Sequence, residues 1–230
     1  MKPVDIINVA GLLMDGKDDG IEQALREKLH PRFLRTIAPT PVSSMKEDPR
    51  LSILRAVTMI REVIADSVRQ FGESNVLLVG RSLGAYTALL AALEMDFENI
   101  PMAILIEGPL HPEVTVEPPT LLPPLMACGA HYRMRPEYMR RAVERIQELD
   151  AAHHLLIVQG GGSDSVVPLE AQILPGNFET IQLPPHIGGR SLGLQRPLPE
   201  GYRNHLFWSE EKMSMIVDII QKATGGPHGN

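Results

Sequence analysis

The chain has 230 residues, a formal net charge of −6 at pH 7, 43% hydrophobic residues and 22% charged residues. This length and balance predict a single globular domain over residues 1–230, and the acidic balance lacks the excess of Lys and Arg that general nucleic-acid binders carry. The single Cys128 excludes an intrachain disulfide. No apolar run reaches the roughly 20 residues of a membrane span, and no signal or transit peptide is evident, so we expect a cytoplasmic protein with no membrane partner.

Apolar patterning predicts strands that alternate with helices along the chain. Strands are expected where short apolar runs stand between turn residues, and helices where apolar residues recur every three or four positions. The expected strands are residues 4–9, 33–38, 76–79, 102–106, 155–158 and 180–183. The expected helices are residues 21–30, 49–71, 85–93, 136–149, a short helix at 169–173 and a last helix with Ser209 as its N-cap. This alternation predicts an α/β fold with a mostly parallel sheet of about six strands, covered by helices on both faces.

A proline-rich stretch interrupts the alternation after the fourth expected strand. Residues 109–135 contain six prolines and an apolar cluster at residues 121–126. Two interpretations are open for this excursion. It is either a small lid over one face of the domain or a surface connection between a strand and a helix.

The clearest chemical signal lies where the third expected strand turns into a helix. There the motif Gly80-x-Ser82-x-Gly84 joins an apolar strand to an Ala- and Leu-rich helix. A strand that turns directly into a helix strains the backbone of the central serine, and the flanking glycines leave room for the sharp turn. The serine then stands at a helix N-terminus, where free N–H groups and the helix dipole favour developing negative charge. The motif predicts a nucleophile; the alternative is a tight turn that merely contains a serine.

A serine nucleophile needs a base, and the base needs an acid that fixes its tautomer. The loops that follow the strands should carry both groups, because parallel sheets bind ligands beyond the carboxyl ends of their strands. Asp164 follows the fifth expected strand and is the preferred acid, although it could form an Asx turn or a cap. Glu107 ends the fourth strand and is the rival acid. His205, just before the last helix, is the preferred base, and His186, directly after the last strand, is its rival; each could instead be a solvated loop histidine.

Two backbone N–H groups are needed to hold the oxyanion of a tetrahedral intermediate. The N–H of Leu83, directly after the serine, is one. The loop after the first strand should supply the other, from Leu12 or else from Leu13. No pair of His or carboxylate residues has the spacing of metal ligands, so we expect neither a metal nor another cofactor.

Taken together, these motifs resemble an α/β-hydrolase of the serine type. The resemblance rests on residues 80–84, 162–168 and 205–211 with the last helix, in an order that spans nearly the whole chain. It implies a Ser82–Asp164–His205 triad and hydrolysis of a carboxylic ester or thioester. Two strands that usually open the family are missing, so the fold is expected in a reduced form, and Ala10-Gly11 stands where the family often has His-Gly. The separation of Asp164 from His205 is long for the family, which keeps His186 open.

The expected partner is therefore a small-molecule acyl substrate. The sequence is also compatible with two other classes of function. One is a ligand-binding protein on the same fold that does not turn its ligand over, since a fold alone does not prove an activity. The other is an acyltransferase, peptidase or thioesterase that uses the same triad with a different substrate or acceptor.

Overall fold

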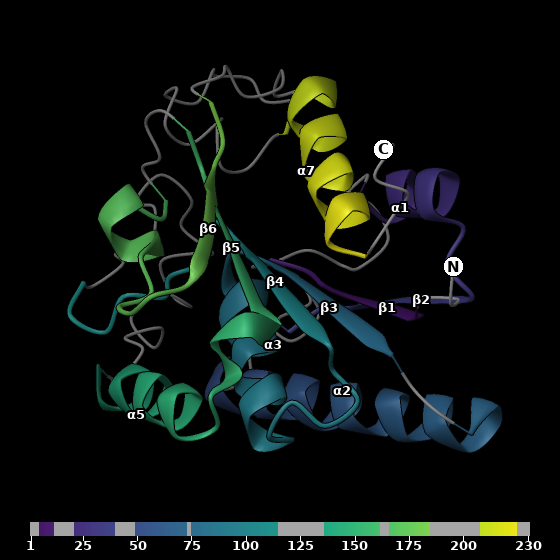
Figure 1. Ribbon diagram of the computed structural model, residues 1–230, viewed down its shortest axis with the longest axis horizontal. Coiled ribbons are helices and arrows are strands. Elements are labelled where there is room, and N and C mark those ends of the chain that lie inside the picture. The colour runs from purple at the N-terminus through teal and green to yellow at the C-terminus, as the bar shows by residue number, and fades with distance from the viewer. Residues whose placement is uncertain are drawn as a thin grey trace.

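The computed structural model describes residues 5–11, 21–39, 49–72, 75–114, 136–161, 166–184 and 208–224. Six strands lie in these ranges: β1 Asp5–Val9, β2 Phe33–Ile37, β3 Val76–Arg81, β4 Met102–Ile106, β5 Leu155–Gln159 and β6 Glu179–Gln182. They form one sheet in the order β2-β1-β3-β4-β5-β6, and every neighbouring pair is parallel (Figure 1). The predicted α/β fold with a parallel sheet of six strands is therefore confirmed.

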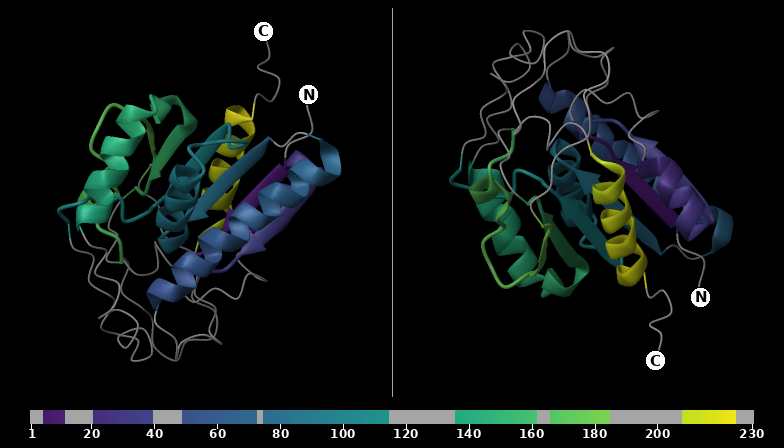
Figure 2. Two further views of the ribbon diagram at one scale, coloured as in Figure 1. Left: turned by 90° about the horizontal axis from the view of Figure 1, so that it is seen from below. Right: turned by 90° about the horizontal axis from the view of Figure 1, so that it is seen from above.

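Helices cover both faces of this sheet, as predicted (Figure 2). One face carries α2 Pro49–Phe71, α3 Leu83–Glu94 and α5 Pro136–Glu148, and the other carries α1 Ile21–Leu29 and α7 Glu210–Ala223. Each strand contributes to both cores because successive side chains point to opposite faces. In β3, Leu78 packs with Ile60 of α2 on one face, whereas Leu77 belongs with Ile216 of α7 on the other.

The element boundaries differ from the predicted ones mainly around the serine motif. The bounds of α2 and β4 are as predicted, but β3 runs on to Arg81 and α3 begins at Leu83, so the turn between them is a single residue. The short helix expected at 169–173 is the 3₁₀ helix η3 Leu169–Gln172, and a second 3₁₀ helix, η2 Ala151–His154, was not predicted. The cap of the last helix is confirmed, since Ser209 Oγ accepts from the N–H of Lys212 at 3.1 Å.

Most of the proline-rich excursion falls outside the described residues, so neither its interpretation as a lid nor the alternative is tested. Its first residues are described and pack on η3, where the N–H groups of Leu110 and His111 both donate to the carbonyl of Ala171. Within the described ranges, no helix combines the length and the hydropathy needed to span a membrane.

A buried carboxylate fastens the amino end of β1. Asp5 is fully buried, and its carboxylate accepts from Arg32 Nε at 2.8 Å and from Ser67 Oγ at 2.6 Å. The Arg32 guanidinium also lies over the ring of Phe71, 3.7 Å from its centroid. Burial alone would raise the pKa of Asp5, but the hydrogen bonds from Arg32 and Ser67 and the charge of Arg32 outweigh it, so this pKa is lowered from its ordinary value of 3.8.

We predict that Asp5→Asn lowers the free energy of unfolding at pH 7 by about 2 kcal/mol, because it leaves Arg32 beside an uncharged amide. A carboxyl whose pKa is lower in the folded state stabilises above its unfolded pKa, and this contribution is lost as the pH falls toward the folded pKa. The gap between wild type and variant should therefore shrink as the pH falls below about 4. Urea unfolding at several pH values measures it. Asp66→Asn on the exposed side of α2 is the matched control, and an equal loss in that variant would contradict a specific contribution of Asp5.

Candidate active site

Ser82 lies in the one-residue turn between β3 and α3 with a strained backbone. Its φ is 54° and its ψ is −124°, a combination that non-glycine residues rarely adopt. Hydrogen bonds hold it there, because the Ser82 N–H donates to Ile106 O at 2.8 Å and the Ser82 carbonyl accepts from Ala85 N at 3.0 Å. The sharp, strained turn that the motif predicts is therefore present. Strain of this kind persists where the surroundings over-determine it, which is common at functional sites.

The two motif glycines are explained by close packing. A Cβ atom on Gly84 would collide with the carbonyl oxygens of Val9 and Ala10, and one on Gly80 would lie 2.6 Å from the Cα of Ala85. The first turn of α3 thus packs directly against the end of β1, without a side chain between them. It follows that the segment after β1, which is expected to supply the second oxyanion donor, starts beside Ser82.

Ser82 also lies at the switch point of the sheet. From β1 the chain passes through α1 on one face to reach β2, whereas from β3 it passes through α3 on the opposite face to reach β4. The connections after β1 and β3 therefore diverge, and this divergence opens a crevice at the carboxyl ends of adjacent strands in such sheets. Ser82 follows β3 at that edge, which is where a parallel sheet binds its ligands.

The environment of Ser82 favours an anion. Leu83 opens α3, so its N–H is among the first four that have no acceptor within the helix. Ser82 is 8% exposed and Leu83 7% exposed, and most residues of α3 are buried. A buried helix end is screened little by solvent, so its N-terminal dipole stabilises negative charge more strongly than an exposed end does.

The structure places only some of the predicted site residues. Ser82, Leu83 and the rival acid Glu107 are described and lie together at the carboxyl ends of β3 and β4. The remaining predicted residues lie outside the described ranges: Asp164, His205, its rival His186, Leu12 and Leu13.

Both carboxylate oxygens of Glu107 contact residues at or just before the start of α7. Its side chain is 1% exposed, its Oε1 is paired with the ammonium group of Lys212, and its Oε2 accepts from Trp208 Nε1 at 3.2 Å. The guanidinium of Arg81, next to Ser82, lies over the Trp208 ring at 4.0 Å from its centroid. The buried Glu107–Lys212 ion pair therefore adjoins the serine turn. The side chains of Arg81 and Lys212 both lie against the Trp208 ring.

Sequence reasoning missed Lys212, Trp208 and Arg81. One signal could have found Lys212, because Lys212, Ile216 and Ile220 recur every four residues and share the buried face of α7. A lysine on an apolar face needs a buried carboxylate, and Glu107 was already a candidate. No local pattern distinguishes the other two residues.

The described residues contain no group of three or more His, Cys, Asp or Glu side chains that could hold a metal ion.

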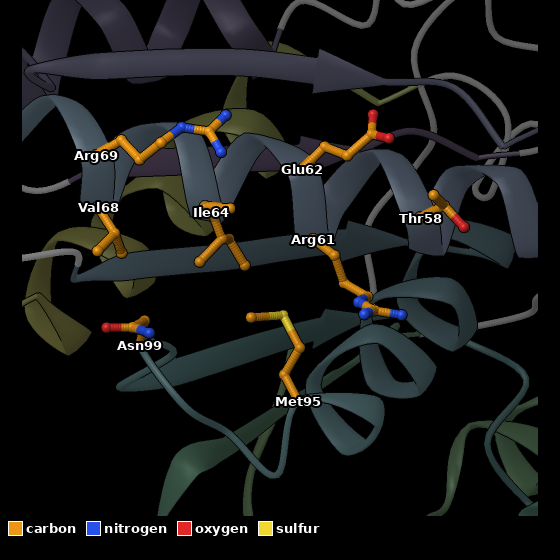
Figure 3. A pocket seen from close by; sticks show the side chains of 9 residues that line it. Thr58, Arg61, Glu62, Ile64, Val68, Arg69, Met95 and Asn99 are labelled. Atoms are coloured by element: carbon orange, nitrogen blue, oxygen red, sulfur yellow. The ribbon is translucent and has the colours of Figure 1, made fainter.

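A surface cavity of about 640 Å³ lies apart from this site, between α2 and the end of α3 (Figure 3). It is lined mostly by apolar and long charged side chains: Thr58, Arg61, Glu62, Ile64, Ala65, Val68, Arg69, Met95 and Asn99. Asn99 O accepts from the N–H of Val76, the first residue of β3, so the cavity reaches the amino ends of the strands. Ser82 stands at the carboxyl ends, and the cavity is therefore not part of its site.

Comparison with solved structures identifies the fold as that of the α/β-hydrolases. A gene product of Listeria innocua superimposes with a TM-score of 0.60 at 11% identity, covering 96% of this chain and 95% of that one. Est1E from Butyrivibrio proteoclasticus gives a TM-score of 0.54 at 16% identity, covering 96% of this chain and 86% of its own. The thioesterase domain from the curacin biosynthetic pathway gives a TM-score of 0.52 at 14% identity, covering 95% of this chain and 90% of that domain. No protein-family model matches the sequence, and the search of curated proteins gives no significant match.

Proposed function

We propose that this chain is a serine hydrolase that cleaves a carboxylic ester or thioester through an acyl-enzyme on Ser82. The observation that carries the proposal is the strained turn at Ser82, held at the switch point of a parallel sheet and at the N-terminus of a buried helix. The likeness to α/β-hydrolases supports it at the level of the fold. Because one of the similar structures is a thioesterase domain, thioesters should be tested beside oxygen esters.

In this proposal His205 takes the proton of the Ser82 hydroxyl as its oxygen attacks the acyl carbon. Asp164 accepts from the other ring nitrogen, which fixes the tautomer and stabilises the imidazolium. The N–H groups of Leu83 and Leu12 hold the oxyanion, and loss of one such donor typically raises the barrier by roughly 3 kcal/mol. The imidazolium then protonates the leaving alcohol or thiol. Water, deprotonated by His205, then attacks the acyl carbon, and the imidazolium returns the proton to the Ser82 oxygen as its bond to the acyl carbon breaks and the acid leaves.

The positions of the described neighbours support this assignment. Asp164 follows Gly160 and Gly161 at the end of β5, two strands from β3 in the sheet, and a Cβ on Gly161 would collide with the carbonyls of Leu183 and Pro184 after β6. His205 precedes Trp208, whose indole reaches Glu107 beside the serine turn. The chain segments that carry the acid and the base thus leave from described residues at the edge of the sheet where Ser82 stands.

Turnover of a graded series tests the proposal: p-nitrophenyl acetate, butyrate and octanoate, with the corresponding acyl thioesters. We expect hydrolysis with a burst of p-nitrophenol close to one equivalent of enzyme, because the activated esters acylate Ser82 faster than water releases the acid. Transfer to an added alcohol or amine in preference to water would indicate an acyltransferase. Thermal stabilisation by the acyl compounds without any turnover would contradict the proposal and indicate a binding protein.

A further inference from the structure

We infer that Glu107 is a positioning residue, which together with Lys212 and Trp208 forms a buried brace between the end of β4 and the start of α7. This inference rests on the proposed function, because the chain segment that the brace would position is the one leading into Trp208, which carries His205 three residues earlier.

On the sheet side, Glu107 stands at the junction of three strands. Ile106 O accepts from Ser82 N at 2.8 Å, and the N–H of Glu107 donates to Val158 O of β5 at 2.8 Å. The φ of Glu107 is 49°, a positive value that non-glycine residues seldom adopt. Its carboxylate also lies against the end of β5, since a Cβ on Gly160 would be 2.7 Å from Oε1. The carboxylate is therefore fixed by the ends of the strands around the serine turn.

On the helix side, both oxygens of this carboxylate accept from the start of α7. Lys212 lies in the first turn of the helix, and Trp208 lies just before the N-cap Ser209. The two charged side chains are each 1% exposed, and Lys212 Nζ also lies 5.1 Å from the centroid of the Trp208 ring. The brace thus fixes both the helix end and the residue that leads into it.

This arrangement favours bracing over the alternative that Glu107 is the acid of the triad. A triad acid must accept from the ring N–H of the base, whereas the donors described at the two oxygens of Glu107 are Lys212 and Trp208. Desolvating an ion pair is costly, and a buried pair seldom stabilises a fold more than apolar side chains of equal volume would. The expected benefit of the Glu107–Lys212 pair is that it fixes the start of α7 relative to the end of β4. Fixing Trp208 would anchor the chain three residues after His205, the proposed base.

The double variant Glu107→Gln/Lys212→Met tests the brace, because it removes the ion pair without leaving a buried charge. We expect a folded protein whose kcat for a p-nitrophenyl ester falls by about tenfold to a hundredfold with little change in KM, as misplaced catalytic groups produce. In a plot of kcat/KM against pH, the acidic limb of this variant should lie at the same pH as that of the wild type. Asp164→Asn should instead move the limb to lower pH, because the base loses the carboxylate that raises its pKa. Amide hydrogen exchange in the first turn of α7 should become faster.

Lys28→Met/Asp218→Asn is the matched control, since this exposed lysine–carboxylate pair joins the same helix to α1 at 3.0 Å. It should leave both kcat and exchange at the start of α7 unchanged. A wild-type kcat in the Glu107→Gln/Lys212→Met variant would overturn the inference. So would a shifted acidic limb with activity near that of Ser82→Ala, because Glu107 would then be the acid.

If the double variant fails to fold, Trp208→Phe keeps the Glu107–Lys212 pair and an aromatic ring beside Arg81 but removes the hydrogen bond to Glu107, and it should lower kcat in the same direction. A wild-type kcat in Trp208→Phe would also overturn the inference. Absence of turnover by the wild type would contradict the proposed function instead, and faster exchange in α7 would still report the brace.

Discussion

Replacing Ser82 with Ala is expected to lower kcat for ester hydrolysis at least about 10⁴-fold, because the attacking oxygen is lost. The backbone should tolerate the change, since Ala carries the same strain as Ser at a φ of 54°. Thermal unfolding and far-UV circular dichroism should therefore match the wild type. Steady-state kinetics with the most reactive p-nitrophenyl ester of the graded series measures the effect.

The control for this substitution is Ser214→Ala, which removes a serine hydroxyl that accepts from Lys28 at 3.0 Å on the exposed side of α7. It should retain wild-type kcat and KM. Turnover by Ser82→Ala within tenfold of the wild type would remove Ser82 from the mechanism. The strained turn would then be structural.

The choice between the two candidate bases carries the second large effect. We expect His205→Ala to lower kcat by about 10⁴-fold or more, because without its base the serine hydroxyl stays protonated. His186→Ala should leave kcat within a few fold of the wild type. The two variants make the same chemical change at residues 186 and 205, so each is the control for the other. The reverse result would make His186 the base and contradict the assignment of His205.

The fold was predictable because its signals are local. Four-residue spacing of apolar side chains defines α2 from Pro49 to Phe71, and short apolar runs define the central strands. The errors have a physical reason. Gly80 and Arg81 read as part of a loop, yet Gly80 pairs with Val9 and Leu105 in the sheet, because the turn at Ser82 is tight enough for the strand to continue up to it.

The site was predictable only in part, for the same reason. The serine motif is five consecutive residues, so its strained turn could be inferred from sequence. The brace joins Glu107 to Lys212 across more than one hundred residues, and no pattern within either segment specifies that partner. Only the position of Lys212 on the apolar face of α7 gives a hint. Partners of this kind are set by how helices dock on the sheet, which is a property of the whole fold.

The most direct test of the proposed nucleophile is to treat the wild-type protein with a fluorophosphonate probe and find the modified residue by peptide mass spectrometry. Such a probe phosphonylates a serine whose hydroxyl is activated by a neighbouring base. The proposed mechanism predicts one adduct, on Ser82, that is lost in Ser82→Ala and formed far more slowly in His205→Ala. An adduct on another residue, or an intact Ser82 after prolonged treatment of folded protein, would contradict it.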